Sequence, residues 1–189
     1  MLYFISDLHL GHYNIIKYQN RPFSSVEEQS EVIINNINEK VEPKDTLIIG
    51  GDAFMYRRKG AKNKEWFNRI NCRRVILVTG NHDKQKYIKQ CSYAQVVTDM
   101  YFKVQDKEIK GGLQPIHIYH YPLLSWRSKF PHAQYGWHLY GHTHANTDEH
   151  HPDDGKYPVK NICVENLNYS PISYLDLRDN YFSKWVKYK

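Results

Sequence analysis

Short apolar runs rich in β-branched residues recur along the first half of the chain. Residues 2–5, 46–49 and 75–78 are apolar almost throughout, a pattern typical of strands that are buried on both faces. Polar segments with helical spacing separate these runs. The first half of the chain is therefore predicted to alternate strands with helices.

Helices are predicted between these strands, at residues 13–18, from about Ser24 to Pro43, and at 63–70 and 84–90. The longest of them carries an apolar stripe at helical spacing. A capping box, formed either by Ser24 with Glu27 or by Ser25 with Glu28, marks its start. Pro43 ends it, because proline lacks the backbone N–H that a helix requires.

The period of the pattern changes after residue 90, and the second half of the chain reads mostly as strands. These are expected at residues 96–97, 100–104, 116–119, 137–140, 161–164 and 172–177. No repeat or linker interrupts the chain, so residues 1–189 are interpreted as a single domain. Its class is α/β, with a mixed pair of sheets rather than one fully parallel sheet.

Residue types that bind metals follow the predicted strands directly. Asp7 and His9 follow the first strand, and His142 and His144 follow the strand at 137–140. Because residues i and i+2 of a strand point to the same side, each pair is expected to converge on one point. Strand carboxyl ends position ligands in folds of this class, so Asp52, Asn81 and His120 are expected to complete one shared metal site of seven ligands. His82 and Asp83, which follow Asn81, are expected beside it.

Glycines precede several of these candidate ligands. Gly51, Gly80 and Gly141 each stand immediately before one. Glycine permits tight turns and positive φ, so these positions are predicted to let the chain swing the following side chain inward.

The donor set favours divalent metals of intermediate hardness. Carboxylate, amide and imidazole groups suit Mn²⁺, Fe or Zn²⁺ better than Ca²⁺, and we expect two ions, with Mn²⁺ preferred. Two such ions about 3.5–4 Å apart hold a phosphate and lower the pKa of water to about 7, so that a shared hydroxide attacks phosphorus. His82 is the candidate general acid for the leaving group, and Asp83 is expected to hold its ring oriented and protonated.

The motifs Asp7-x-His9, Gly51-Asp52, Gly80-Asn81-His82-Asp83, His120 and Gly141-His142-Thr143-His144 occur in this order. Together they resemble the calcineurin-like metallophosphoesterase superfamily, and in particular its small single-domain members from bacteria and phages. The resemblance implies a four-layer α/β/β/α sandwich with two mixed β-sheets and the site at one edge. It also implies that Asp7, His9, Asp52 and His144 hold one metal ion, that Asp52 bridges, and that Asn81, His120 and His142 complete the second.

The sequence also departs from one branch of that superfamily. The Ser/Thr protein phosphatases carry Gly-Asp-x-Val-Asp-Arg-Gly and Gly-Asn-His-Glu, whereas this chain has Gly51-Asp52-Ala53-Phe54-Met55 and an aspartate at Asp83. A phosphoprotein phosphatase is therefore not favoured. The segments 20–23 and 165–173 are similar to the small bacterial and phage members.

Three further residues are candidates for contact with the substrate phosphate. His12 adjoins the first motif, Arg21 offers a guanidinium for a phosphate oxygen, and Arg57 follows Asp52 by a short loop. Each has an alternative interpretation: a capping or surface role for His12, a structural ion pair for Arg21 and a solvated loop for Arg57.

The expected activity is hydrolysis of a small, nucleotide-like phosphodiester or phosphomonoester. A nuclease that acts on single-stranded nucleic acid is the alternative within the same chemistry. A scaffold that uses the metals only to bind a partner is a remote alternative, since the ligand set is complete.

Composition and charge limit the classes of partner that the chain is expected to bind. The net charge of +6 favours an anionic partner, here a small phosphorylated substrate; nucleic acid is not favoured, because no recognisable nucleic-acid module is present. The sequence contains no apolar run of the roughly 18 residues that a membrane span requires, and no secretory signal is visible. Three widely spaced cysteines are interpreted as reduced thiols, so a cytoplasmic location is expected. No sequence signal indicates an oligomeric state.

Overall fold

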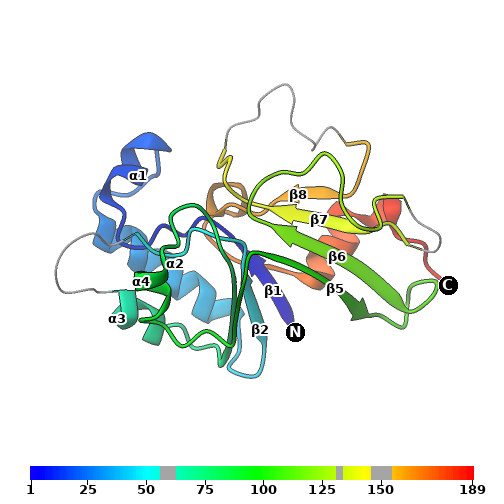
Figure 1. The fold of residues 1–189 in the computed structure, drawn as a ribbon, viewed down its shortest axis with the longest axis horizontal. Coiled ribbons are helices and arrows are strands. Elements are labelled where there is room, and N and C mark those ends of the chain that lie inside the picture. Colours follow the sequence, from blue (N-terminus) through cyan, green and yellow to red (C-terminus); the bar gives the residue numbers. More distant parts are fainter. Residues whose placement is uncertain (56–62, 131–133, 146–154) are drawn as a thin grey trace.

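Two β-sheets lie between helices in the computed structural model, which describes residues 1–55, 63–130, 134–145 and 155–189 (Figure 1). The first sheet has the strand order β4-β3-β2-β1-β9. Its strands are β1 (Leu2–Ile5), β2 (Thr46–Ile49), β3 (Arg74–Val78), β4 (Gln95–Val97) and β9 (Ile172–Ser173). Neighbours among β1 to β4 run parallel, and β9 pairs antiparallel with β1.

The second sheet has the strand order β5-β6-β7-β8. Its strands are β5 (Asp99–Gln105), β6 (Leu113–Tyr119), β7 (Trp137–Tyr140) and β8 (Val159–Asn161). β5 and β6 are antiparallel, whereas β6, β7 and β8 are parallel to one another. Both sheets are therefore mixed, which confirms the predicted α/β class with two mixed sheets.

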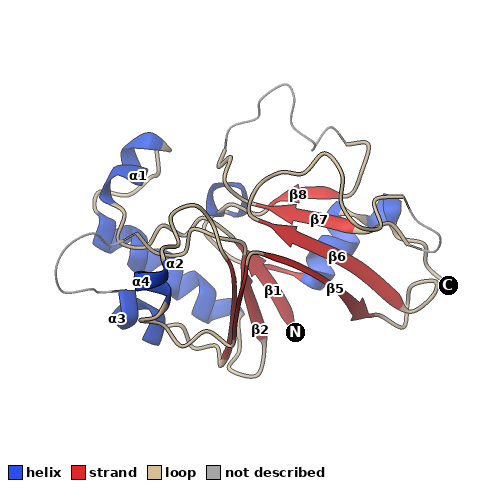
Figure 2. Ribbon diagram, viewed as in Figure 1, coloured by secondary structure: helices blue, strands red, loops and turns tan. Residues whose placement is uncertain are grey.

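Helices gather beside the first sheet (Figure 2). They are α1 (Tyr13–Tyr18), α2 (Val26–Lys40), α3 (Asn63–Asn68) and α4 (Gln85–Ile88). Apolar residues of α2 and α3 form one core with alternate residues of β1, β2 and β3, among them Ile33, Ile37, Trp66, Ile5, Leu47 and Leu77. The apolar stripe of α2 thus packs where its helical spacing predicts.

The start of α2 resolves the two capping alternatives. Ser25 is the N-cap, and its hydroxyl accepts a hydrogen bond from the backbone N–H of Glu28. The Glu28 carboxylate in turn accepts from the backbone and the hydroxyl of Ser24, at 2.7 Å and 2.5 Å. Both serines therefore contribute to the start of the helix.

A second core joins the two sheets. Phe4 and Ile48 of the first sheet cluster with Ile116 and Leu139 of the second. The helical segments that follow β9 complete this core; they are α5 (Tyr174–Asp176), η2 (Leu177–Tyr181) and η3 (Ser183–Trp185). Tyr174 and Phe182 lie against the Trp137 ring, with centroid distances of 5.3 Å and 4.8 Å.

Two of the predicted strands give way to helical turns. The strand expected at 161–164 lies at 159–161 and is followed by the 3₁₀ helix η1 (Val164–Leu167). The strand expected at 172–177 ends at Ser173, whose hydroxyl forms a capping box with Asp176 and starts a helix. Val164 and Leu177 remain buried in these helical turns, which is why the apolar pattern alone resembled longer strands.

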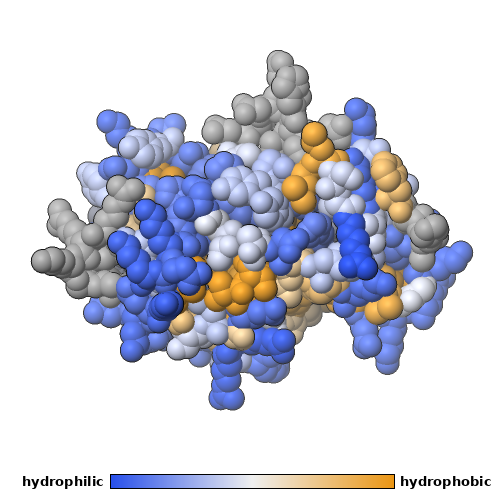
Figure 3. Space-filling view, viewed as in Figure 1, coloured by the Kyte–Doolittle hydropathy of each residue, from blue (hydrophilic) through white to orange (hydrophobic). Residues whose placement is uncertain are grey.

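Polar side chains cover most of the face drawn in Figure 3, and apolar side chains form small separate patches on it. Among the helices in the described ranges, none has the length and apolar character that crossing a membrane requires.

Candidate metal centre

The carboxyl ends of β1, β2, β3, β6 and β7 carry the seven predicted metal ligands. The first three strands are parallel neighbours, and β6 and β7 are parallel neighbours in the second sheet. All seven side chains are therefore delivered to the same edge of the two sheets, as predicted.

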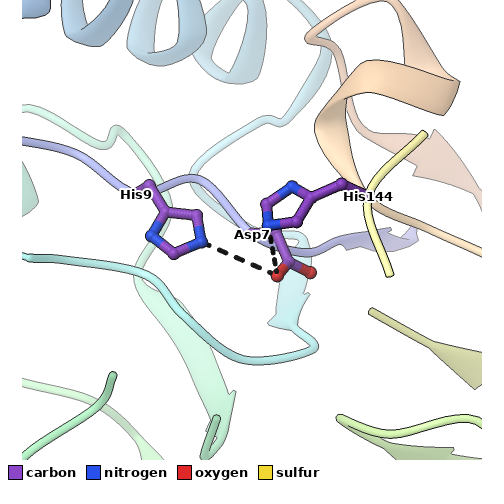
Figure 4. Close-up of side chains that lie close together, drawn as sticks. All are labelled: Asp7, His9 and His144. Atoms are coloured by element: carbon purple, nitrogen blue, oxygen red, sulfur yellow. Dashed lines mark ion pairs between the residues drawn. The ribbon is translucent and has the colours of Figure 1, made fainter. Parts of the chain in front are cut away.

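A first group of donors surrounds one point (Figure 4). Asp7 Oδ1 lies 3.8 Å from Nε2 of His9 and 3.8 Å from Nε2 of His144. Oδ2 of Asp52 lies 3.6 Å from the same His9 nitrogen. Ligands at about 2.0–2.2 Å from an ion are roughly 3–3.5 Å from one another. A small inward adjustment of these four side chains would therefore place them around one cation.

A second group adjoins the first and shares Asp52 with it. His120 Nε2 lies 3.5 Å from Asp52 Oδ2 and 3.1 Å from Asn81 Oδ1. His142 Nδ1 lies 3.1 Å from the same Asn81 oxygen. Asp52 Oδ2 therefore faces His9 in the first group and His120 in the second.

Unpartnered buried atoms show that the residues fit divalent cations. Asp7 Oδ1 and His9 Nε2 are buried and have no hydrogen-bond partner. Buried polar atoms are normally paired, since leaving one unpaired costs about 1–3 kcal/mol. Both orphaned atoms point at the centre of the first group, where a cation would satisfy them together. The donor set of oxygen and imidazole nitrogen matches Mn²⁺, Fe or Zn²⁺.

The electrostatics of the site keep key ligands ready to bind a cation. Burial, reinforced by the charge of Arg21 and by neighbouring histidines, lowers the pKa of His9 far below its usual range, so its ring is neutral. Burial alone would raise the pKa of Asp52, but hydrogen bonds from His120 and from the His82 backbone outweigh it and lower that pKa. Asp52 is therefore a carboxylate.

His120 shows how much negative charge the ligand set concentrates. Burial disfavours its protonated ring, yet the hydrogen bond to Asp52 and the charges of Asp7 and Asp52 raise its pKa to about 9. The same field favours a divalent cation, which would displace that proton.

The convergence of the ligand pairs has a different cause from the one predicted. Asp7, His9, His142 and His144 lie beyond their strands and adopt left-handed backbone conformations, with φ of 57°, 48°, 70° and 51°. Asp52 does the same, with φ of 51°. Side-chain alternation along a strand is therefore the wrong explanation. Non-glycine residues in this region are strained, and such strain clusters at functional sites.

Two of the glycines are needed for space rather than for positive φ. A Cβ added at Gly80 would lie 2.2 Å from Asp52 Oδ1, and one added at Gly141 would lie 2.2 Å from Asp7 Oδ2. Only Gly51 of these three combines close contact with positive φ, at 111°. The prediction of turn glycines is thus corrected at Gly80 and Gly141, which let ligands approach the backbone closely.

His82 lies at the rim of the centre. Its side chain is 33% exposed, and its Nε2 lies 3.9 Å from Asp52 Oδ2. Asp83 does not orient this ring, contrary to prediction. Its two oxygens instead accept hydrogen bonds from the backbone N–H groups of Asp52, Ala53 and Gly80, at 2.7–3.0 Å. Asp83 therefore joins the loop after β2 to the loop after β3 through these hydrogen bonds. Burial is the main reason that the pKa of Asp83 rises to about 6.

The three candidate phosphate contacts have different outcomes. His12 lies at the site, with Nδ1 3.2 Å from His9 Nδ1 and its ring centroid 5.9 Å from that of His82. Arg21 cannot contact the substrate as expected, because its side chain is fully buried and bonded to Glu165, which confirms the alternative of a structural ion pair. Arg57 lies outside the described residues.

Sequence reasoning missed the residues that support His144. Glu165 accepts a hydrogen bond from its Nδ1 at 2.9 Å, and Asn161 and Asn166 donate to its carbonyl at 2.7 Å and 2.9 Å. Only the likeness of segment 165–173 to small bacterial and phage proteins hinted at a role for Glu165.

Two mixed sheets with clustered aspartate and histidine side chains that could hold a metal ion at their shared edge are the arrangement expected of a metal-dependent hydrolase. Residues 1–166 match the model of the family described as calcineurin-like phosphoesterase. The chain belongs to this family and is a metallophosphoesterase, a hydrolase of phosphoric esters.

Several relatives are similar along most or part of the chain. The uncharacterized protein MJ1445 of Methanocaldococcus jannaschii is 35% identical over 177 residues, which cover 93% of this chain and 88% of that protein. The DNA double-strand break repair protein Mre11 of Nanoarchaeum equitans is 31% identical over 130 residues. These cover 64% of this chain but only 32% of Mre11. A protein of unknown function from Aquifex aeolicus, AQ665, has a similar crystal structure, with a TM-score of 0.71 and 26% identity over 94% of this chain and 97% of that one.

Proposed function

We propose that this protein hydrolyses small, nucleotide-like phosphodiesters or phosphomonoesters with the help of two divalent ions, Mn²⁺ being preferred. The observation that carries the proposal is the position of Asp52 Oδ2, 3.6 Å from a nitrogen of the first donor group and 3.5 Å from a nitrogen of the second. A carboxylate between two sets of ligands is what a two-ion centre requires.

Different residues of the chain would have different roles in such a reaction. Bound ions supply Lewis acidity, which activates water and offsets negative charge on the phosphate. Asp7, His9 and His144 would hold one ion and Asn81, His120 and His142 the other, with Asp52 shared. His82 would donate a proton to the departing oxygen, since its partly exposed ring lies beside Asp52 on the rim. His12 would hydrogen-bond a phosphate oxygen from the same side.

The donor chemistry is compatible with the proposed Mn²⁺ but does not select it over other divalent ions. The ligand set consists of carboxylate, amide and imidazole groups, and Mn²⁺ accepts all three. Zn²⁺ favours fewer, softer ligands, and Fe remains compatible with the same set. Metal preference is therefore tested together with the substrate.

Aromatic rings on two sides of the centre support a nucleotide-like substrate. The Tyr121 ring lies 4.6 Å from that of His142, and the exposed Tyr18 lies 6.5 Å from that of His12. Such rings provide surfaces on which nucleobases stack. The net charge of +6 favours a phosphorylated substrate as well.

The test is a panel of substrates assayed with Mn²⁺, Fe²⁺ and Zn²⁺ in turn. Bis-p-nitrophenyl phosphate, p-nitrophenyl phosphate, cyclic nucleotides and short oligonucleotides would separate diesters, monoesters and nucleic acids. We expect turnover of small esters that is strongest with Mn²⁺ and that is lost in Asp52→Ala. Absence of hydrolysis across the panel with every metal would contradict the proposal.

A nuclease acting on single-stranded nucleic acid is the second candidate. Two observations favour it: the similarity to Mre11, a DNA double-strand break repair protein by name, and the net charge of +6. Contacts with several backbone phosphates would make cleavage fall steeply as salt rises. Oligonucleotide cleavage with that salt dependence, at rates above those for small diesters, would favour the nuclease.

We also place the reaction in the cytoplasm. The three cysteines are free thiols in the structure, and Cys163 is buried beside Asp7. Reduced cysteines are typical of that compartment.

A further inference from the structure

A buried arginine–glutamate pair lies directly behind the first donor group. Nε and Nη2 of Arg21 both bond to Glu165 Oε1, at 2.9 Å and 2.7 Å. The Arg21 side chain is fully buried and that of Glu165 is 6% exposed. A buried ion pair is weak evidence for stability, because desolvation offsets much of the attraction. Its position next to a ligand set therefore needs another explanation.

Glu165 determines which nitrogen of His144 is available to a metal ion. Its Oε1 lies 2.9 Å from His144 Nδ1, so that nitrogen carries the proton and donates it to the carboxylate. His144 Nε2 is left with a lone pair, and this nitrogen lies 3.8 Å from Asp7 Oδ1. The pair thus fixes both the tautomer and the direction of the ring.

Arg21 acts on the other half of the first group. Its Nη2 donates to the carbonyl of Asp7 at 2.8 Å, and its Nη1 donates to the carbonyl of Leu8 at 3.1 Å. Nη1 also donates to Gln29 Oε1 at 3.0 Å, and Gln29 Nε2 donates to the carbonyl of His9 at 3.3 Å. Asp7 and His9 are the strained, left-handed residues of this segment, so these bonds hold them where their side chains meet.

All five N–H groups of the Arg21 guanidinium are therefore engaged in a fixed, planar arrangement. Lysine offers three donors on a point charge and cannot reproduce it. One guanidinium joins the loop after β1, which carries Asp7 and His9, to the segment after β8, whose Glu165 supports His144.

We propose that Arg21 and Glu165 are positioning residues for the first metal ion, and that they set the affinity of the Asp7, His9, Asp52 and His144 group without touching the ion. This inference rests on the proposed two-ion site but not on the identity of the substrate. Partners of metal-bound histidine of this kind contribute about 10–100-fold to metal affinity.

The test uses Glu165→Gln and Arg21→Lys in the full chain, with Arg178→Lys as the matched control. Arg178 is also a buried arginine in an ion pair, bonded to Asp106 at 3.0 Å. Asp106 follows the end of β5 that pairs with the start of β6, whereas His120 follows the other end of β6. The control therefore weakens a buried pair of the same kind far from the metal ligands.

Mn²⁺ would be titrated into each metal-free protein by calorimetry, with electron paramagnetic resonance to distinguish a coupled pair of ions from a single one. We expect Glu165→Gln and Arg21→Lys to lose 10–100-fold in affinity at one site and to show single Mn²⁺ where the wild type shows the pair. Arg178→Lys should keep wild-type affinity at both sites, even with a lower melting temperature.

Two results would overturn the inference alone: wild-type affinity at both sites in the two folded variants, or an equal loss of affinity in Arg178→Lys. A wild-type chain that binds no Mn²⁺ at this centre would overturn the two-ion site as well. Binding of two ions without hydrolysis of any substrate would refute the proposed function and leave the inference standing.

Discussion

At the scale of single residues, the candidate metal ligands can be selected from the sequence, but the residues that support them cannot. Asp7, His9 and the other five ligands stand directly after apolar runs, a pattern visible in one dimension. The role of Arg21 depends on carbonyls of Asp7 and Leu8 that point toward it only in the folded chain. The sequence therefore left Arg21 with two interpretations, a contact with the substrate or a structural ion pair, and the structure shows the ion pair.

Replacing His82 tests its role as the general acid. His82→Ala should lower kcat by about 10²–10⁴-fold, the usual contribution of a general acid, while Mn²⁺ stoichiometry stays unchanged because His82 is not among the ligands. His117→Asn, which alters a histidine on the second sheet away from the centre, should keep normal turnover. A metal-loaded His82→Ala protein with normal kcat would remove the assignment.

A single methyl group at Gly141 should be enough to disturb the centre. The added Cβ would lie 2.2 Å from both Asp7 Oδ2 and Ser6 Oγ, so Asp7 must move away from the first ion. We expect Gly141→Ala to lose at least tenfold in Mn²⁺ affinity by calorimetry. Gly112→Ala is the control, because a Cβ there meets only the Asp106 carbonyl at 3.9 Å.

The control should cost about 1 kcal/mol of stability, since Gly112 has a φ of 68°, but should not change metal binding. Equal Mn²⁺ affinity in Gly141→Ala and the wild type would show that Asp7 has room to move.

At the scale of elements, the apolar pattern predicts where strands lie better than where they end. Strands β1, β2 and β7 have the expected bounds. The pattern fails after residue 160 because Val164 and Leu177 are buried in short helices, and burial looks alike in a strand and in a turn of helix. Ser173 is the residue that indicates a helix here, because its hydroxyl accepts a hydrogen bond from the backbone N–H of Asp176 and so caps the start of the helix.

Strand β7 contains a histidine that should make the fold sensitive to acid. His138 is fully buried, its Nδ1 donates to the carbonyl of His117, and its Nε2 accepts from the backbone N–H of Leu123. Burial lowers its pKa to about 4, compared with about 6.5 in an unfolded chain. Between pH 6.5 and 4 the unfolded chain therefore binds a proton that the folded protein does not, so stability falls as pH falls.

The expected loss from this histidine is about 3 kcal/mol by pH 4, and it vanishes above pH 6.5, where His138 is neutral in both states. Urea unfolding of the metal-free protein between pH 4 and 7 would measure it. His138→Gln, which keeps a donor and an acceptor, should show a shallower fall than the wild type. Parallel pH profiles for the two proteins would contradict the assignment.

At the scale of the whole molecule, the candidate metal centre lies where the loops of the two sheets meet. Ligands after β1, β2 and β3 come from one sheet, and ligands after β6 and β7 come from the other. The order of motifs was enough to predict this class of fold through its resemblance to a family. Contacts between the loops of the two sheets accompany the left-handed conformations of these residues; for example, the Asp7 carboxylate accepts a hydrogen bond from the His142 backbone at 3.0 Å.

Bound metal should therefore stabilise the entire fold. Binding to the folded state alone adds about 2.7 kcal/mol at a metal concentration one hundred times the Kd, or roughly 5–10 °C in Tm for a chain of this size. Calorimetric melting with Mn²⁺ and with EDTA would measure the difference. Identical melting temperatures would mean that Mn²⁺ does not bind preferentially to the folded chain.

The measurement that tests the central claim most directly is anomalous X-ray diffraction from crystals of the protein grown with Mn²⁺. The account predicts two anomalous peaks on either side of Asp52 Oδ2, one among Asp7, His9 and His144 and the other among Asn81, His120 and His142. A single peak that leaves one of these groups empty, or Mn²⁺ bound elsewhere, would contradict it.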